Sequence, residues 1–227
     1  MELYHLLNRG VDKRIIFIDD ADRARFVHDL WEFNDTNDVD NVRHRVPYGT
    51  GTKKNHVTDL RNPYMEKERI VDLHGWCLMH NHYHLLLSER TEGGLTKFIR
   101  RLNVGYANYF NERHERSGTL FQGRTKKIPI STDAHFLHIL NYIHLNPLDF
   151  KRDSRKWRTG TIRNTKEALR HLDKYRWSSY RDYCGKKNFP SVLTTELFGD
   201  VFGAYEKRLS SYLNDLETDV IRTYPLE

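Results

Sequence analysis

The sequence predicts an α+β fold, and three observations support this prediction. Short apolar runs with strand-like composition occur at residues 4–8, 69–79 and 83–87. Only a few residues separate the second run from the third, which indicates a β-hairpin. Between residues 95 and 114, apolar residues recur at helical spacing and predict an amphipathic helix. A sheet that contains a hairpin and packs against helices would bury both patterns.

The elements outside this central region are predicted from their boundaries. Asp19-Asp20-Ala21-Asp22 is a favourable helix start and predicts a helix over residues 20–34. Residues 34–63 are rich in Asn, Asp, Gly and Thr and show little periodicity, so we expect a surface insertion there. Three more helical segments are expected, over residues 133–145, over residues 164–172 and from residue 194 onward.

The stretch His80-Asn81-His82-Tyr83-His84 carries the first chemical signal. In a strand, successive side chains point to opposite faces, so His82 and His84 share one face. Two imidazoles held side by side on a strand can supply two nitrogen ligands to a divalent metal. The simpler alternative is two histidines that happen to fall near a strand end.

The helix predicted over residues 133–145 carries the second signal, because its two sides differ. One side is apolar and is expected to pack on the sheet; its members are Phe136, Leu137, Leu140 and Ile143. A narrow stripe on another side carries polar, chemically capable groups, namely His135, His138, Tyr142 and Asn146. Ser131-Thr132-Asp133 can cap the start of this helix, and Asn146-Pro147 ends it.

Tyr142 and Asn146 would complement the two histidines chemically. The amide oxygen of Asn146 suits a divalent cation as a third ligand, with water or substrate oxygens completing its shell. A phenol has a pKa of about 10 and is a poor nucleophile alone, but a metal that polarises a phosphate makes attack easier. The alternatives are a half-buried helix tyrosine and an asparagine that merely ends its helix. Spacing alone does not show that these two residues meet the histidines.

The charge distribution indicates a polyanionic partner. The net charge is +6 and the pI is about 9.2. Residues 97–176 hold 18 Lys and Arg against 7 Asp and Glu, whereas residues 1–60 hold 9 against 11. Residues 121–130 read as an extended basic segment that could follow phosphates, with Phe121 as a stacking platform. Candidate contacts to nucleic acid are Arg100, Arg101, Phe121, Arg124, Lys126, Lys127, Lys151, Arg152, Arg155 and Lys156.

The same composition argues against several other classes of protein. Cys77 and Cys184 are far apart and form no CxxC pair, which argues against a structural zinc site and a disulfide framework. No apolar run is long enough to span a membrane, and the first residues do not form a signal peptide. We therefore expect a cytoplasmic protein.

Taken together, five short motifs resemble a known family. The chain resembles the single-tyrosine HUH transposases, in particular those of the REP-associated type, from about residue 4 to residue 180. The motifs are His82-Tyr83-His84, Tyr142-Ile143-His144-Leu145-Asn146-Pro147, Gly105-Tyr106-Ala107, Phe121-Gln122-Gly123-Arg124 and Trp177-Ser178-Ser179-Tyr180. Residues 1–180 would then form the nuclease domain, with the insertion at 34–63, and residues 181–227 a C-terminal helical extension.

The resemblance implies a fold and a mechanism. The fold is ferredoxin-like: an antiparallel sheet with helices on one face, the histidines on a central strand and the tyrosine on a facing helix. Such enzymes cut single-stranded DNA beside hairpins, often repetitive extragenic palindromes, with Mg²⁺ or Mn²⁺. The tyrosine forms a 5′-phosphotyrosine and leaves a free 3′-hydroxyl. By position, the metal ligands are His82, His84 and Asn146, and the nucleophile is Tyr142.

The sequence departs from the family at His80, which stands where proline is usual, so His80 could approach the site. His80, His135 and His138 are expected to lie around the ligands or at the surface, and His135 or His138 could contact DNA. Two other functions stay open. A non-cleaving DNA or RNA hairpin-binding protein would need neither metal nor Tyr142. A metal hydrolase would use water as its nucleophile and would cut DNA without forming a covalent adduct.

Overall fold

The computed structural model describes residues 1–37, 67–159, 162 and 164–214. Within these residues the centre of the fold is a four-stranded antiparallel sheet in the order β2-β3-β1-β4. The strands are β1 (Leu3–Arg9), β2 (Val71–Leu78), β3 (His82–Glu89) and β4 (Lys126–Pro129). The predicted hairpin is confirmed, because β2 and β3 pair antiparallel from Leu78 opposite Tyr83 outward.

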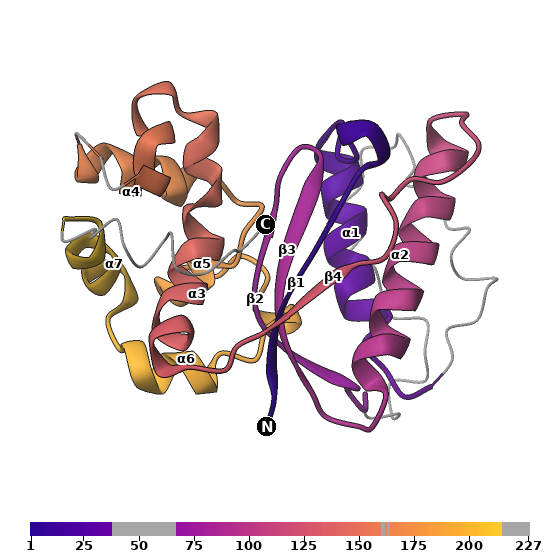
Figure 1. Cartoon of the computed structure of the whole chain (residues 1–227), viewed down its shortest axis with the longest axis horizontal. Helices are drawn as coiled ribbons and strands as arrows, with labels where there is room; N and C mark the ends of the chain where they lie inside the picture. Colours follow the sequence, from indigo (N-terminus) through magenta and orange to yellow (C-terminus); the bar gives the residue numbers. More distant parts are fainter. Residues whose placement is uncertain (38–66, 160–161, 163, 215–227) are drawn as a thin grey trace.

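Helices α1 (Asp20–Glu32) and α2 (Gly94–Arg113) cover one face of the sheet, on the right in Figure 1. Both were predicted, and the cap of α1 is Asp19, whose carboxylate accepts from the backbone of Ala21 and Asp22. The two helices pack closely where Gly105 meets Phe33, because a Cβ on Gly105 would lie 2.4 Å from the Phe33 ring.

The later helices cover the other face of the sheet (Figure 1). They are α3 (Asp133–Leu145), α4 (Thr165–Lys174), α5 (Tyr180–Tyr183), α6 (Glu196–Phe202) and α7 (Tyr205–Asn214), with 3₁₀ turns at Val11–Lys13, Asn146–Phe150, Arg152–Thr159 and Pro190–Val192. The predicted α+β fold with an antiparallel sheet is confirmed. The expectation of helices on one face only is wrong: a helical layer covers each face, because β3 carries buried apolar side chains on both, such as Leu85 on one and Leu86 on the other.

Helix α3 packs differently from the expectation that only its apolar side meets the sheet. Leu140 does contact the sheet, at Gly75 of β2, but Phe136 stacks on Phe198 of α6 and Leu137 is 40% exposed. The polar stripe of α3 faces the histidine strands instead. The apolar side is therefore divided between the sheet, helix α6 and the surface.

The C-terminal segment forms two helices rather than one, separated at Gly203, whose φ of +56° favours glycine. Both pack with α3 in one apolar cluster. A domain boundary near residue 180 stays a prediction.

The predicted insertion begins later than residue 34. Asn34 is buried and its side chain bonds the backbone of Ile70 and Val71, so it belongs to the core. The backbone N–H of Thr36 donates to the carbonyl of Glu68 at 2.8 Å, which brings the two ends of the segment together. Residues 38–63 of the predicted insertion lie outside the described residues. None of the helices in the described part of the chain has the length and apolar character needed to cross a membrane.

Candidate active site

Three histidines from two neighbouring strands meet on the face of the sheet that α3 covers. His82 and His84 share this face of β3, as predicted, and their ring centroids are 4.9 Å apart. His5 of β1 joins them: its ring is nearly parallel to that of His84, with the centroids 5.1 Å apart, and its Nε2 lies 2.9 Å from His84 Nδ1. All three are buried. The antiparallel register of β1 and β3 explains this contact. His5 is opposite Leu86 and Leu7 is opposite His84, so His5 and His84 are diagonal neighbours on the same face of the sheet.

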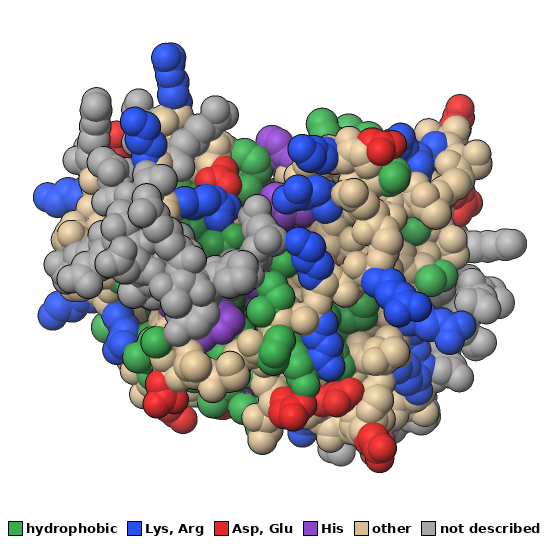
Figure 2. Space-filling view, in the orientation of Figure 1, with side chains coloured by type: hydrophobic (Ala, Val, Ile, Leu, Met, Phe, Trp, Pro, Cys, Tyr) green, Lys and Arg blue, Asp and Glu red, His purple; other side chains and the backbone are tan. Residues whose placement is uncertain are grey.

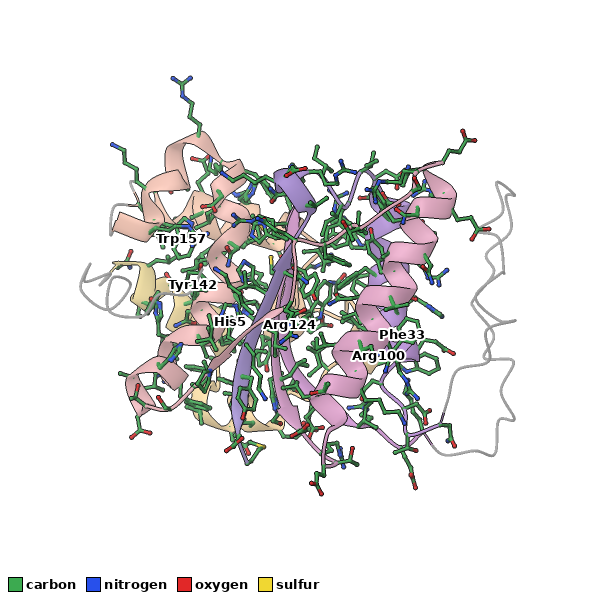
Figure 3. All side chains as sticks on the ribbon, turned by 45° about the vertical axis from the view of Figure 1, so that its right-hand side comes forward. His5, Phe33, Arg100, Arg124, Tyr142 and Trp157 are labelled. Atoms are coloured by element: carbon green, nitrogen blue, oxygen red, sulfur yellow. The ribbon has the colours of Figure 1, made fainter. Side chains whose placement is uncertain are left out.

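Tyr142 of α3 lies directly over these rings. Its ring meets His84 edge-on at 5.8 Å and His5 at 6.0 Å between centroids, and Figure 3 shows Tyr142 between His5 and Trp157. The tertiary structure therefore brings the candidate nucleophile to the histidines, which sequence spacing could not show. Tyr142 is only 2% exposed, so a phosphate could reach its hydroxyl only after neighbouring side chains move.

Arg158 ties the tyrosine to the end of α3. Its guanidinium donates to the Tyr142 hydroxyl, to Asn146 Oδ1 and to Asp149 Oδ2, each at 2.8 Å. Asp149 also accepts from the indole N–H of Trp157 at 2.8 Å, and the guanidinium stacks over the Trp157 ring at 4.4 Å. These contacts hold Arg158 in one orientation, with the nucleophile and the candidate amide ligand attached to it.

The two histidines and Asn146 are chemically suited to hold a divalent cation. His84 Nε2 is buried and has no hydrogen-bond partner among the described residues, as expected of a nitrogen reserved for a ligand. His82 Nδ1 lies 2.7 Å from Asn81 Oδ1. Asn146 is fully buried, with its amide nitrogen bonded to the Tyr142 carbonyl at 2.9 Å. No three His, Cys, Asp or Glu side chains of the described residues could hold a metal ion, so such a site would depend on the Asn146 oxygen.

Burial keeps the imidazoles of this region neutral. It lowers the pKa of His5 to about 3 and that of His138 to about 4, with smaller contributions from the nearby His135. The pKa of His84 falls well below its ordinary value, first through burial and then through the charges of His82, His5, Arg158 and Arg9. Neutral imidazoles are the form that binds metals.

Acid should destabilise the protein through its buried histidines. The pKa of His5 and of His144 is lowered from 6.5 to about 3 by burial, so below pH 6.5 the unfolded chain binds protons that the folded chain excludes. Stability is therefore fully present above pH 6.5 and is lost as the pH falls towards 3. Each of the two should remove about 2 kcal/mol between pH 6.5 and pH 5. Asp19 titrates lower, with its pKa held at about 2 by Arg113, and contributes little in this window.

Urea unfolding at pH 7.5 and pH 5 measures this loss. His144→Gln is the informative variant, because it removes one of these titrations while leaving an amide to bond Ser179 and Tyr205, the present partners of His144. We expect a shallower pH dependence in the variant; an unchanged slope would contradict the assignment of the acid sensitivity to His144.

Residues 39–146 match the family model described as IS200-like transposases. The resemblance to tyrosine transposases is confirmed. The matched region contains His82, His84, Tyr142 and Asn146, and it supports an enzyme of the tyrosine transposase class. His5 and Arg158 lie outside it.

Two further comparisons complete the picture. Among solved structures, the chain is similar to one described as the REP-associated tyrosine transposase bound to a REP hairpin. The TM-score is 0.46 and the identity 10%, over 86% of this chain and 87% of that chain. A search of curated proteins finds none that matches.

The three further histidines of the transposase-like site lie in different surroundings. His80 is largely exposed and stacks on Phe150 at 4.2 Å, in the turn between β2 and β3. His135 is buried on the same helix as His138, and it contributes, after burial, to the lowered pKa of His5 and of His138. His138 lies 6.1 Å from the Tyr142 ring between centroids, and its Nδ1 bonds the hydroxyl of Tyr212. The structure thus brings His135 and His138 to the site and leaves His80 at its edge.

The candidate DNA contacts are divided between the two faces of the molecule. Arg100 and Arg101 lie on α2, beyond the sheet from the histidines, and Figure 3 shows Arg100 close to Phe33. Arg101 donates to the Asp35 carbonyl at 2.6 Å, which gives it a structural role. Phe121 is half-buried and packs on Tyr83, on the same side of the sheet.

The two lysines of strand β4 point to opposite faces of the sheet. Lys126 is opposite Leu7 and therefore shares the histidine face, whereas Lys127 lies over the Tyr4 ring at 3.8 Å on the other face. Arg124, in the turn before β4, is exposed. Figure 2 shows basic side chains and histidines gathered along the boundary between the two helical layers on the face that β4 crosses.

The basic side chains of the loop after α3 differ in their surroundings. Lys151 forms an ion pair with Glu167, while Arg152 and Lys156 are exposed. The side chain of Arg155 lies outside the described part of the structure.

Sequence reasoning missed three residues of this site. His5 and Arg9 come from β1, where Arg9 is opposite His82, and Arg158 ends the basic loop. A weak signal existed for His5, which lies within the strand predicted over residues 4–8, whereas Arg9 falls just outside that strand. Nothing in the sequence distinguished Arg158 from the other cations of its loop.

Proposed function

We propose that this protein is a metal-dependent single-stranded DNA nuclease and strand transferase that cuts beside hairpins through a 5′-phosphotyrosine on Tyr142. One observation carries the proposal: the Tyr142 ring lies 5.8 Å from that of His84, on the strand that also holds His82. A nucleophile placed over two candidate metal ligands is suited to metal-assisted transesterification of a phosphodiester. The family match of residues 39–146 supports the same class of reaction.

In this proposal Mg²⁺ or Mn²⁺ is held by His82, His84 and the amide oxygen of Asn146. A cation bound there would polarise the scissile phosphate and neutralise charge that develops on it. His82 and His84 stand on a central strand with neighbours on both sides, so their positions are rigid. Asn146 is positioned by its own helix, since its amide nitrogen donates to carbonyls of the preceding turn.

Tyr142 would act as the nucleophile of a transesterification. Its phenol oxygen bonds to phosphorus as the bond from phosphorus to the 3′-oxygen breaks. The phenol gives up its proton, and the leaving 3′-oxygen takes one up, so protons balance over the step. The products are a 5′-phosphotyrosine and a free 3′-hydroxyl that can attack the adduct in a later strand transfer. Arg158, bonded to the phenol oxygen, can stabilise the negative charge that forms there.

DNA would approach along the histidine face of the sheet near β4. Lys126 lies two strands away from His84 on this face, or about 10 Å at the usual strand spacing. With Arg124 it can contact the phosphates on either side of the scissile one. Recognition of hairpins is proposed from the family resemblance. Residues 1–180 would carry the chemistry and residues 181–227 the helical extension.

The burial of Tyr142 is the observation that favours the alternative of a non-cleaving hairpin-binding protein. In the nuclease proposal, Arg158 attracts the scissile phosphate towards the phenol oxygen to which it is bonded. In the alternative, Tyr142 is a structural residue that DNA never reaches.

A doubly labelled substrate tests these functions. A pool of single-stranded DNA hairpins with random flanks, carrying one dye at the 5′ end and another at the 3′ end, is mixed with the protein in Mn²⁺ or in EDTA. Denaturing gels then follow both dyes. We expect Mn²⁺ to produce a protein band that carries the 3′ dye, and a shortened free fragment that carries the 5′ dye.

Each other result would decide against the proposal in a specific way. Cutting without a protein band would indicate water as the nucleophile. Tight binding of hairpins from the pool without any cutting would favour the binding protein. A protein band that carries the 5′ dye would reverse the polarity of the reaction.

A further inference from the structure

His5 contacts one of the candidate metal ligands but belongs to neither the HUH motif nor the matched family region. We propose that His5 is a positioning residue that accepts a hydrogen bond from His84 Nδ1 and so presents His84 Nε2 to the divalent cation. This inference rests on the proposed function, because it assumes a cation at His82 and His84.

The contact is too well formed to be incidental packing. His5 Nε2 and His84 Nδ1 are 2.9 Å apart, and the two rings are inclined by only 12°. Both side chains are 0% exposed, so water cannot replace either partner. The residues come from adjacent, hydrogen-bonded strands, and their relative position is fixed by the sheet.

Each of the two rings uses only one of its nitrogens in this contact, and this decides which ring donates the hydrogen bond and which accepts it. His5 Nδ1 and His84 Nε2 are both buried without a hydrogen-bond partner among the described residues. A cation at His84 Nε2 requires the lone pair there, so the His84 proton must be on Nδ1, facing His5. His5 itself is not a ligand in this arrangement, because a neutral imidazole that accepts at Nε2 carries its proton on Nδ1 and has no second lone pair to offer.

The neighbouring histidine is oriented by a similar contact. His82 Nδ1 lies 2.7 Å from Asn81 Oδ1, and Asn81 Nδ2 donates to the Lys13 carbonyl at 3.1 Å. The second bond identifies the Asn81 atom next to His82 as the oxygen, so His82 must donate from Nδ1. Both histidines thus meet an acceptor at Nδ1, so in both the nitrogen that would bind the cation is Nε2. An outer hydrogen-bond acceptor of this kind fixes the tautomer and ring orientation of a metal-binding histidine.

Three variants at position 5 separate the hydrogen bond from packing. His5→Gln places an amide oxygen near the position of Nε2 and keeps an acceptor, whereas His5→Leu and His5→Met fill the space without one. Mn²⁺ affinity is measured by electron paramagnetic resonance on the metal-free protein, with thermal unfolding as a check on folding. We expect His5→Leu and His5→Met to weaken Mn²⁺ binding by about 10- to 100-fold, and His5→Gln to restore most of it. Unchanged affinity in the two apolar variants would overturn the proposal.

The wild-type protein supplies a test that no folding defect can obscure. Long-range ¹H–¹⁵N NMR correlations of the Mg²⁺-loaded protein report which nitrogen of His84 carries the proton. We expect Nδ1; a proton on Nε2 would overturn the inference.

The same measurements distinguish a failure of this inference from a failure of the proposed function. If His82→Ala leaves Mn²⁺ binding unchanged, the proposed metal site is wrong, and with it the role of His5. If Mn²⁺ binding depends on His82 and His5 but no DNA adduct forms, the positioning role holds and the nuclease proposal fails. If adducts form normally while His5→Leu binds Mn²⁺ like the wild type, only the role of His5 is wrong.

Discussion

Tyr142→Phe is expected to abolish the covalent DNA adduct, with a loss of at least about a thousand-fold in its rate of formation. The reason is chemical, since phenylalanine has no oxygen to bond to phosphorus. DNA binding should persist, because the basic residues near β4 are untouched. The measurement is the rate at which the labelled protein–DNA band accumulates on denaturing gels in the presence of Mn²⁺.

A control must account for the stability that the hydroxyl provides. The Tyr142 hydroxyl accepts from Arg158 at 2.8 Å, and a hydrogen bond to a charged group contributes about 1.5–3 kcal/mol. Tyr109→Phe is the matched control: the Tyr109 hydroxyl also contacts an arginine, Arg113, at 3.2 Å, but lies on α2 across the sheet. It should lose comparable stability and retain the adduct. An adduct that survives in Tyr142→Phe would exclude Tyr142 as the nucleophile.

Arg158→Ala should have the second-largest effect, on both stability and adduct formation. The substitution removes the partner of three oxygens, and Oδ1 of the fully buried Asn146 would lose the hydrogen bond from Arg158. Leaving a buried acceptor without its bond costs about 1–3 kcal/mol. We expect adduct formation to slow by about 100-fold, since the phenol oxygen loses the cation that stabilises its developing charge.

Arg158→Lys tests whether charge alone is sufficient. A lysine is a single point charge and cannot reproduce bonds from two guanidinium nitrogens, so we expect it to restore less than a tenth of the lost rate. Arg170→Ala, which removes an exposed cation from α4, controls for the change in net charge and should behave like the wild type. Equal or faster adduct formation in Arg158→Ala would show instead that Arg158 holds Tyr142 in an inactive position.

Local patterns in the sequence were sufficient to predict most elements of the fold. The strand with His82 and His84 at alternate positions was predicted, as were the helix with Tyr142 and Asn146 one turn apart and the amphipathic α2. Such patterns are encoded by neighbours along the chain, because the periods of strand and helix decide which side chains share a face. The split of the C-terminal segment at Gly203 was missed, since a single glycine can either lie within a helix or end one.

The sequence by itself therefore determined two halves of a site: a pair of imidazoles on one strand, and a phenol and an amide on one helix. Only the tertiary structure decided that these halves meet, and that the polar stripe of α3 faces the sheet while part of its apolar side packs against α6. It also supplied His5 and Arg158, which contact their partners across 79 and 16 residues of chain. The physical reason is that strand register and helix packing depend on how the whole core is buried, and no local pattern encodes contacts between segments so far apart.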